Sequence, residues 1–322
     1  MISSLNEYIT RLEHAALLSR VTAEVSTNLE IPALARRVSA FADGGQALLF
    51  EKPAGYPFPV ALNLFGSPER MRLALGVDRI HDLTENLDLL IDRVAPCTHE
   101  ELAGQLANHP ELLHFSPVTV NTGPCLDEHI PDLTLFPFLK NWPDDGAASG
   151  NGRYITMGQV ITSDYEGLET NSGIYRCQIH GPRTLSIRWR PGSGASRHYQ
   201  QFSREGERMP LAIALGGPPA LTLTSAWPLP QGVDELVFGG WLRGAAIPVV
   251  QCSHSRLMVP AESEVLIEGF AEPDETLMEG PFGNHTGLYD PAGSAAKVTV
   301  TRITHRSSPI IPATVVGPPP QE

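Results

Sequence analysis

The chain has 322 residues, enough for two domains or one large domain with a substantial buried core. Its hydrophobic content of 42% and charged content of 18% exclude an intrinsically disordered chain and a coiled coil. The formal net charge of −13 argues against nucleic acid or an anionic membrane surface as the main partner.

The first third of the sequence alternates between helical and strand patterns. Ser4 and Glu7 fit a capping box, after which apolar residues recur at helical spacing. Ser67, which precedes a proline, predicts the start of another helix, and Gly76 predicts its end. We expect helices at 5–16, 31–42, 67–76 and 83–94, and strands at 46–50 and 59–65. These patterns predict an N-terminal α/β domain over residues 1–115.

Strand patterns dominate from residue 154 onward. In residues 184–190 the alternation is clean, with apolar residues on one face and Ser186, Arg188 and Arg190 on the other. Strands are expected at 154–163, 173–181, 184–190, 211–216, 247–252, 263–270 and 296–304, interrupted by one helix near 232–243. This pattern predicts an α+β chain whose second domain, residues 116–322, is an antiparallel barrel or sandwich.

The cysteines and the N-terminus bear on the cellular compartment. Cys97, Cys125, Cys177 and Cys252 form no Cys-x-x-Cys pair, so a zinc ribbon and a thioredoxin-type motif are excluded. Charged residues interrupt the first apolar stretch, and no apolar run is long enough to span a membrane. We therefore predict a cytoplasmic protein without a secretion signal or membrane span.

Two polar segments within the β region are candidates for chemistry. Residues 171–176, Asn-Ser-Gly-Ile-Tyr-Arg, end in an arginine that could hold a carboxylate through two parallel hydrogen bonds. Residues 279–287, Glu-Gly-Pro-Phe-Gly-Asn-His-Thr-Gly, combine a flexible backbone with acidic, amide and imidazole groups. Glu279 could act as a general acid or base, and His285 as a proton donor. Each segment taken alone also fits a surface turn with capping side chains and a solvated arginine.

A third group combines Asn171, His198 and Glu235. One nitrogen and two oxygen ligands suit Mn²⁺ or Mg²⁺, particularly where a phosphate completes the coordination. The three residues are far apart in sequence, so their spacing does not show that they meet. A carboxylate at position 235 also fits the start of the helix expected there, where it would favour the helix dipole.

Taken together and in this order, the segments resemble the UbiD family of decarboxylases, which use prenylated FMN. The resemblance rests on residues 170–176, on residues 279–287, and on residues 259–269, Val-Pro-Ala-Glu-Ser-Glu-Val-Leu-Ile-Glu-Gly. Residues 62–66, Leu-Asn-Leu-Phe-Gly, and residues 212–217, Ala-Ile-Ala-Leu-Gly-Gly, also look like that family. The likeness runs over essentially the whole sequence.

The resemblance implies a fold and an activity. The N-terminal α/β domain would be followed by a flavin-reductase-like split β-barrel that holds the cofactor. The reaction implied is a reversible decarboxylation of an aromatic or α,β-unsaturated carboxylic acid through a covalent adduct of substrate and cofactor. A flavin prenyltransferase would supply the prenylated FMN, and Mn²⁺ or Mg²⁺, with K⁺ as an optional further ion, would accompany it.

The resemblance also assigns residues to roles. Asn171, His198 and Glu235 match metal positions, with His198 the least secure because the spacing after Arg176 varies in the family. Arg176 and Glu279 match two members of the catalytic Arg-Glu-Glu/Asp trio. The cofactor-binding residues implied are Asn171, Ser172, Gly173, Ile174, Arg176, Ser225, Trp227 and Pro228.

Two departures from the family pattern affect what we expect. The third catalytic position, normally Glu or Asp, is Asn284, and an amide cannot relay a proton. Glu279, His285 or a water would then protonate the product, or turnover is impaired. The sequence also stops before the family's C-terminal domain, which forms the dimer, so we expect a fragment or a subunit completed by a partner. The alternatives are therefore a non-catalytic cofactor-binding subunit and an ordinary flavin reductase.

Overall fold

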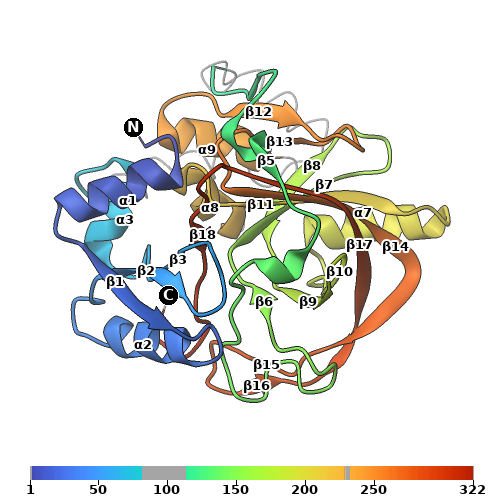
Figure 1. Cartoon of the computed structure of the whole chain (residues 1–322). Helices are drawn as coiled ribbons and strands as arrows, with labels where there is room; N and C mark the ends of the chain where they lie inside the picture. Colours follow the sequence, from blue (N-terminus) through green and yellow to red (C-terminus); the bar gives the residue numbers. More distant parts are fainter. Residues whose placement is uncertain (1, 82–113, 228, 230–232, 322) are drawn as a thin grey trace.

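The computed structural model describes residues 2–81, 114–227, 229 and 233–321, and Figure 1 shows their arrangement. The helix expected at 83–94 and the proposed cofactor residue Pro228 lie outside the described residues. The mixed α+β class predicted from the sequence is confirmed, with helices packed on several separate sheets.

The N-terminal part is built on a four-stranded sheet in the order β1-β2-β3-β18. Its strands are β1 (Leu18–Val25), β2 (Ala47–Pro53), β3 (Val60–Leu62) and β18 (Ile311–Pro312). β1 pairs with β2 in parallel, and β18 pairs in parallel with β3. The last strand of the chain therefore returns to the first sheet, where Figure 1 shows β18 next to β3.

Both faces of this sheet are covered, which explains the unbroken apolar run in β2. Leu48 and Phe50 face the main core of the molecule, whereas Ala47 and Leu49 face a second cluster beneath α1 (Leu5–His14) and α3 (Pro68–Leu75). The helix α2 (Glu30–Ser39) packs on the main-core side. A strand that is buried on both faces needs apolar residues at every position rather than at alternate ones.

The capping residues read from the sequence do cap these helices. The hydroxyl of Ser4 accepts a hydrogen bond from the backbone N–H of Glu7, and that of Ser67 accepts one from the N–H of Arg70. Gly76 ends α3 in the left-handed conformation that glycine adopts without strain. The helices expected at 5–16 and 67–76 are thus confirmed.

The larger part is a nine-stranded sheet whose described pairings are all antiparallel. Its path is β6-β9-β10-β17-β14-β11-β7-β8, with β5 paired to β17. The strands are β5 (Glu128–His129), β6 (Tyr154–Ile155), β7 (Gly158–Ser163), β8 (Thr170–Ile174), β9 (Cys177–Gly181), β10 (Thr184–Ile187), β11 (Met209–Leu215), β14 (Val265–Glu279) and β17 (Gly293–His305).

This sheet is strongly curled. β8 lies at one end of the path and β9 lies near the other end, yet only Tyr175 and Arg176 separate them in the chain. The sheet must bend round until its two ends approach each other at these two residues. The described strands do not hydrogen-bond into a closed barrel, so the sheet remains open at this seam. The split-barrel description remains a prediction.

Three helices accompany the large sheet, where the sequence predicted one. The predicted helix is α9 (Glu235–Arg243), but α7 (Gly194–Arg204) and α8 (Pro219–Ala226) are also present. Two short sheets complete the described structure, one of β4 (Val118–Thr119), β12 (Pro248–Gln251) and β13 (Met258–Pro260), the other of β15 (Phe282–Gly283) and β16 (Tyr289–Asp290). Two 3₁₀ turns lie at Pro124–Leu126 and Leu133–Leu135.

One apolar core joins the two parts of the molecule. Phe50 and Leu62 of the first sheet belong to the same cluster as Val160 and Ile267 of the large sheet. Cys125, Cys177 and Cys252 are buried as free thiols. Within the described part of the chain, no helix has the length and apolar character that crossing a membrane would require.

Candidate active site

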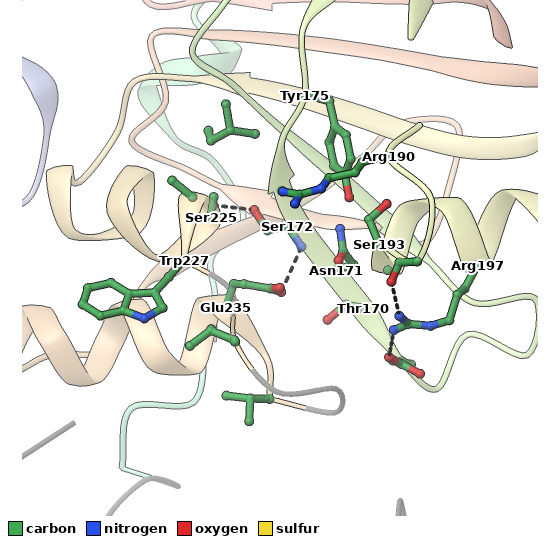
Figure 2. Close-up of a pocket in the computed structure, with 18 of the residues that line it drawn as sticks. Thr170, Asn171, Ser172, Tyr175, Arg190, Ser193, Arg197, Ser225, Trp227 and Glu235 are labelled. Atoms are coloured by element: carbon green, nitrogen blue, oxygen red, sulfur yellow. Dashed lines mark hydrogen bonds and ion pairs between the residues drawn. The ribbon is translucent and has the colours of Figure 1, made fainter. Parts of the chain in front are cut away.

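A cavity of about 810 Å³ opens beside the seam of the large sheet. Its walls are β8, the turn that leads into α7, the end of α8 and the start of α9 (Figure 2). Six of the proposed cofactor residues line it: Asn171, Ser172, Gly173, Ile174, Ser225 and Trp227. The structure therefore gathers on one cavity residues that are up to 56 positions apart in the sequence, from 171 to 227.

Ser172 holds three elements of the wall together. Its backbone N–H donates a 2.9 Å hydrogen bond to the Oε2 atom of Glu235 at the start of α9. Its hydroxyl lies 2.9 Å from the hydroxyl of Ser225 near the end of α8. Pairing with β7 keeps β8 extended, so that Ser172 meets both helices. Figure 2 shows both contacts.

Glu235 is a carboxylate without a cationic partner among the described residues. Asp234, just before it, caps α9 by accepting hydrogen bonds from the N–H groups of Leu236 and Val237. Burial raises the pKa of Glu235 to about 7, although the hydrogen bond from Ser172 acts in the opposite direction. A cation at this place would stabilise the ionised form, which is the chemistry expected of a metal-ligating carboxylate.

Asn171 lies on the same wall and is tightly packed against α7. A Cβ atom on Gly194 would lie only 2.0 Å from the Oδ1 atom of Asn171, so only glycine fits there with this Asn171 conformation. The Nδ2 atom of Asn171 is buried and has no hydrogen-bond partner among the described residues. Because buried polar groups are usually satisfied, this unpaired NH₂ donor indicates a bound ligand that offers a hydrogen-bond acceptor.

His198 is not brought to the cavity wall. It is buried on α7, and its Nδ1 atom lies 2.9 Å from the hydroxyl of Thr162 on β7. Its Nε2 atom is buried and unpaired within the described part of the chain. Burial lowers the pKa of the imidazole, which favours the neutral form that ligates metals. Its role as a metal ligand remains a prediction.

Two cavity arginines were not picked out as site residues from the sequence. Arg197 donates to the Oε1 atom of Glu169 at 3.3 Å and to the carbonyl oxygen of Gly192 at 3.1 Å. Arg190 also lines the cavity and makes no ion pair with any described residue. Ser193 caps the N-terminus of α7 at the same wall, as Figure 2 shows. This wall suits an anionic group.

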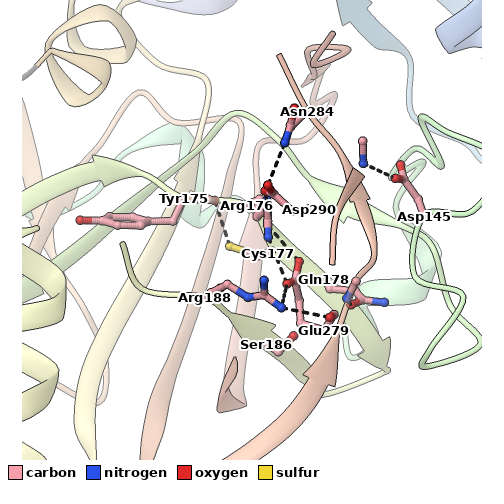
Figure 3. Close-up of polar contacts among 12 residues, drawn as sticks. Asp145, Tyr175, Arg176, Cys177, Gln178, Ser186, Arg188, Glu279, Asn284 and Asp290 are labelled. Atoms are coloured by element: carbon pink, nitrogen blue, oxygen red, sulfur yellow. Dashed lines mark hydrogen bonds and ion pairs between the residues drawn. The ribbon is translucent and has the colours of Figure 1, made fainter. Parts of the chain in front are cut away.

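The second part of the site is a charged cluster centred on Arg176, just after β8 (Figure 3). The guanidinium holds Glu279 through two hydrogen bonds, from Nε to Oε1 at 2.9 Å and from Nη2 to Oε2 at 3.2 Å. Its central carbon also lies 4.6 Å from the centroid of the Phe282 ring. Glu279, the last residue of β14, is fully buried with 0% of its side chain exposed.

Further groups complete this cluster. Arg188, just beyond β10, donates from Nη2 to the Oε2 atom of Glu279 at 2.9 Å. Asp290 accepts a hydrogen bond from the Nη1 atom of Arg176 and another, at 2.7 Å, from the Nδ2 atom of Asn284. Burial of Asp290 would raise its pKa, but these hydrogen bonds outweigh it and hold that pKa below its ordinary value. Neither Arg188 nor Asp290 was expected as a site residue.

The loop that carries these groups is fixed by buried side chains. The N–H of Gly280 donates to the Oε1 atom of Gln178 at 2.9 Å, and the N–H of Gly283 donates to the Oδ1 atom of Asp145 at 2.8 Å. His285, in contrast, is exposed and makes no hydrogen bond or ion pair with any described residue. The loop therefore presents a rigid Glu279 and a solvent-facing His285.

The chemistry of the two parts is complementary. One continuous stretch, β8 and the two residues after it, lines the cavity and then places Arg176 against the buried carboxylate of Glu279. Two of the five N–H donors of Arg176 have no hydrogen-bond partner among the described residues and remain for an anionic ligand. Such a site can bind a ligand carboxylate through Arg176 beside a larger ligand in the cavity. Glu279 can exchange a proton with the molecule that carries this carboxylate.

Two family models match the chain. Residues 9–90 match the N-terminal domain of 3-octaprenyl-4-hydroxybenzoate carboxy-lyase, and residues 117–319 match its Rift-related domain, called UbiD. An uncharacterized protein of Archaeoglobus fulgidus is 38% identical over 320 residues, and one of Aquifex aeolicus is 39% identical over 322 residues. Each alignment covers 99% of this chain, which spans about 65% of the length of these curated relatives.

Solved structures show the same similarity. The UbiD-class enzyme HmfF from Pelotomaculum thermopropionicum, in an evolved dimeric form in complex with prFMN, superposes with a TM-score of 0.83 at 30% identity, covering 97% of this chain and 67% of that one. The vanillic acid decarboxylase of Sedimentibacter hydroxybenzoicus in its closed form gives a TM-score of 0.85 at 28% identity, covering 100% and 66%.

Proposed function

The chain belongs to the UbiD family, and on that premise we propose that it is the cofactor-binding and catalytic part of a prenylated-FMN-dependent decarboxylase. The substrate class proposed is an aromatic or α,β-unsaturated carboxylic acid, with the reaction reversible. The observation that carries the proposal is the path from the cavity-lining strand β8 to Arg176 and its buried partner Glu279.

The residues of the cavity fit a flavin nucleotide. A volume of about 810 Å³ lies within the range of cofactor sites. Arg190 and the capped N-terminus of α7 suit a phosphate, and Trp227 offers an aromatic surface at the opposite wall. The related HmfF is described in complex with prFMN, which supports this choice of ligand.

We assign the cation site to Asn171 and Glu235, with Mn²⁺ or Mg²⁺ as the ion. Both residues line the cavity, and the carboxylate of Glu235 has no cationic partner among the described residues. In the described part of the chain, no group of three or more His, Cys, Asp and Glu is placed to hold a metal ion, so the amide oxygen of Asn171 and a cofactor phosphate would have to complete the coordination. His198 remains a candidate third ligand, and K⁺ a further ion.

Arg176 and Glu279 carry the proposed chemistry. Removing CO₂ from an unsaturated carbon leaves an electron pair, and bound prenylated FMN supplies the electron sink for it. Arg176 binds the substrate carboxylate with its remaining N–H donors. Glu279 then gives a proton to the carbon that has lost CO₂ and regains one from water before the next turnover. His285, exposed on the same loop, remains the alternative donor.

The test is CO₂ release by protein produced together with a flavin prenyltransferase, the proposed supplier of the cofactor. A panel of hydroxybenzoates, cinnamate-like acids and heteroaromatic acids is assayed, with exchange of product hydrogen for solvent deuterium as a second signal. We expect release with at least one acid, and loss of both signals in Arg176→Ala. Cofactor-loaded protein that gives neither signal with any acid would point to a non-catalytic cofactor-binding protein instead. NADH-dependent reduction of bound plain FMN would instead indicate a flavin reductase.

A further inference from the structure

Asn284 uses both the nitrogen and the oxygen of its amide to orient its own loop. Its Nδ2 atom donates to the Oδ1 atom of Asp290 at 2.7 Å. Its Oδ1 atom accepts hydrogen bonds from the N–H and the hydroxyl of Thr286, at 2.8 Å and 2.6 Å. An amide neither carries charge nor exchanges a proton, so the chemical effect of Asn284 must pass through the carboxylate that it holds.

Asp290 is the carboxylate that Asn284 holds, and the fold places it against Arg176. It lies on β16, directly opposite Phe282 of β15, in the register of that short sheet. The same Phe282 ring packs against the guanidinium of Arg176, and Asp290 pairs with that guanidinium from the other direction. Its side chain is 40% exposed, whereas that of Glu279 is 0% exposed.

The charges of the cluster balance only when Asp290 is counted. Arg176 and Arg188 contribute two positive charges, and Glu279 and Asp290 contribute two negative charges when both are ionised. When Glu279 holds a proton, Asp290 is the one carboxylate of the cluster that still faces Arg176. Without Asp290, an Arg176 whose partner Glu279 is protonated would meet a substrate carboxylate with its full charge uncompensated.

We propose that Asp290, oriented by Asn284, is a positioning residue that fixes Arg176 and partly neutralises it, so that the substrate carboxylate is bound weakly enough to leave as CO₂. The inference rests on the proposed decarboxylase function. The negative charge of a carboxylate disappears from that group as CO₂ departs. An arginine that binds it too strongly stabilises the ground state more than the transition state and slows the reaction.

The test varies the net charge of the cluster, which is zero in wild type when both carboxylates are ionised. Asp290→Asn gives the cluster a net charge of +1, and Asn284→Asp gives it −1. The double exchange Asn284→Asp with Asp290→Asn returns it to zero. Asp274→Asn, which removes an exposed carboxylate elsewhere on β14, is the matched control for overall charge. Benzoate is the probe, and its Kd is measured by calorimetry on folded, cofactor-free protein.

We expect benzoate to bind Asp290→Asn about five- to tenfold more tightly than wild type. Asn284→Asp should bind benzoate more weakly, because it adds a negative charge beside Asp290 and Arg176, and the double exchange should fall back toward wild type. Unchanged or weaker binding by Asp290→Asn, a double exchange no different from Asp290→Asn, or a shift equal to that of Asp274→Asn would each overturn the inference.

Measurements of kcat and KM separate this role from a general loss of structure. In cofactor-loaded Asp290→Asn we expect kcat and KM to fall together, with kcat lower by about tenfold or more. A raised KM, or an unchanged kcat, would contradict the role. If no form releases CO₂ while the benzoate series follows the cluster charge, the decarboxylase proposal fails, but the charge balance at Arg176 stands.

Discussion

The cavity and the charged cluster are adjacent but differ in how completely their polar groups are satisfied. In the cavity, the Nδ2 atom of Asn171 is buried without a partner, and Glu235 has no cation beside it within the described structure. In the cluster, both oxygens of Glu279 and both oxygens of Asp290 accept hydrogen bonds.

The difference indicates that the cavity is completed by bound ligands, whereas the carboxylates of the cluster are already held in place by the protein. Unsatisfied polar groups in the cavity are costly unless a ligand pairs with them, which fits a cofactor and a cation that stay bound. The carboxylates of the cluster already accept hydrogen bonds at both oxygens, so their charges are in place before a substrate arrives. Substitutions in the cluster should therefore affect the binding and turnover of the substrate, and substitutions at the cavity wall should affect the binding of the cofactor and the cation.

The largest effect is expected for Glu279→Gln. The variant keeps the shape of the side chain and one of its two acceptor oxygens but removes the exchangeable proton, so kcat for CO₂ release should fall by about 10²–10⁴-fold. Glu275→Gln, on the same strand and paired with Lys297 at the surface, should leave kcat unchanged. Retained turnover in Glu279→Gln, with cofactor content and melting temperature as in wild type, would remove Glu279 from the chemistry.

A smaller effect is expected where the loop of the cluster is anchored. Burial raises the pKa of Asp145 to about 6, against hydrogen bonds from the N–H groups of Gly283 and Trp142. The unfolded chain therefore loses this proton at lower pH than the folded protein, and stability falls as pH rises from about 4 to about 6. Asp145→Asn should lack this loss, which amounts to about 2–3 kcal/mol.

The free energy of unfolding of wild type and Asp145→Asn is measured by urea unfolding at pH values on either side of this range. The comparison gives the slope of stability against pH for each protein. Asp144→Asn, which removes the exposed neighbouring carboxylate, is the control for the charge change. Equal slopes for wild type and Asp145→Asn would show that Asp145 ionises in the folded protein as it does in the unfolded chain.

The smallest effect is expected at the cavity wall. In Gly194→Ala the new Cβ would lie 2.0 Å from the Oδ1 atom of Asn171, which must rotate away from its position. We expect Mn²⁺ affinity to fall by about tenfold, as for other changes beside a metal ligand, while alanine favours the helix. Gly181→Ala, where a Cβ meets open space, is the matched control. Electron paramagnetic resonance of Mn²⁺ measures the affinity of both variants. Equal Mn²⁺ affinities for Gly194→Ala and Gly181→Ala would contradict the prediction.

The sequence predicted the parts of the fold that depend on local pattern. The helix that begins after Ser4 and the helix between Ser67 and Gly76 were readable because caps and spacing are local. The helix α7 was missed because its start, Gly192-Ser193-Gly194, also fits a turn, although Ser193 is its cap. The helix α8 was missed because six of its eight residues are buried, leaving it no polar face to mark its period.

The site was predictable only in part for the same reason. Arg176 and Glu279 stood out because each lies in a dense polar segment. Asp290 did not, because its role depends on the pairing of β15 with β16, which brings it to Arg176 across 114 positions of sequence. Arg188 lay on the polar face of a predicted strand, but its contact with Glu279 depends on the bend of the large sheet.

The most direct test of the central claim is mass spectrometry of the small molecule released when the protein, produced together with a flavin prenyltransferase, is denatured. We expect prenylated FMN in stoichiometric amount, with less retained by Gly194→Ala than by Gly181→Ala. A protein that releases no flavin, or that releases only plain FMN despite the prenyltransferase, would contradict it.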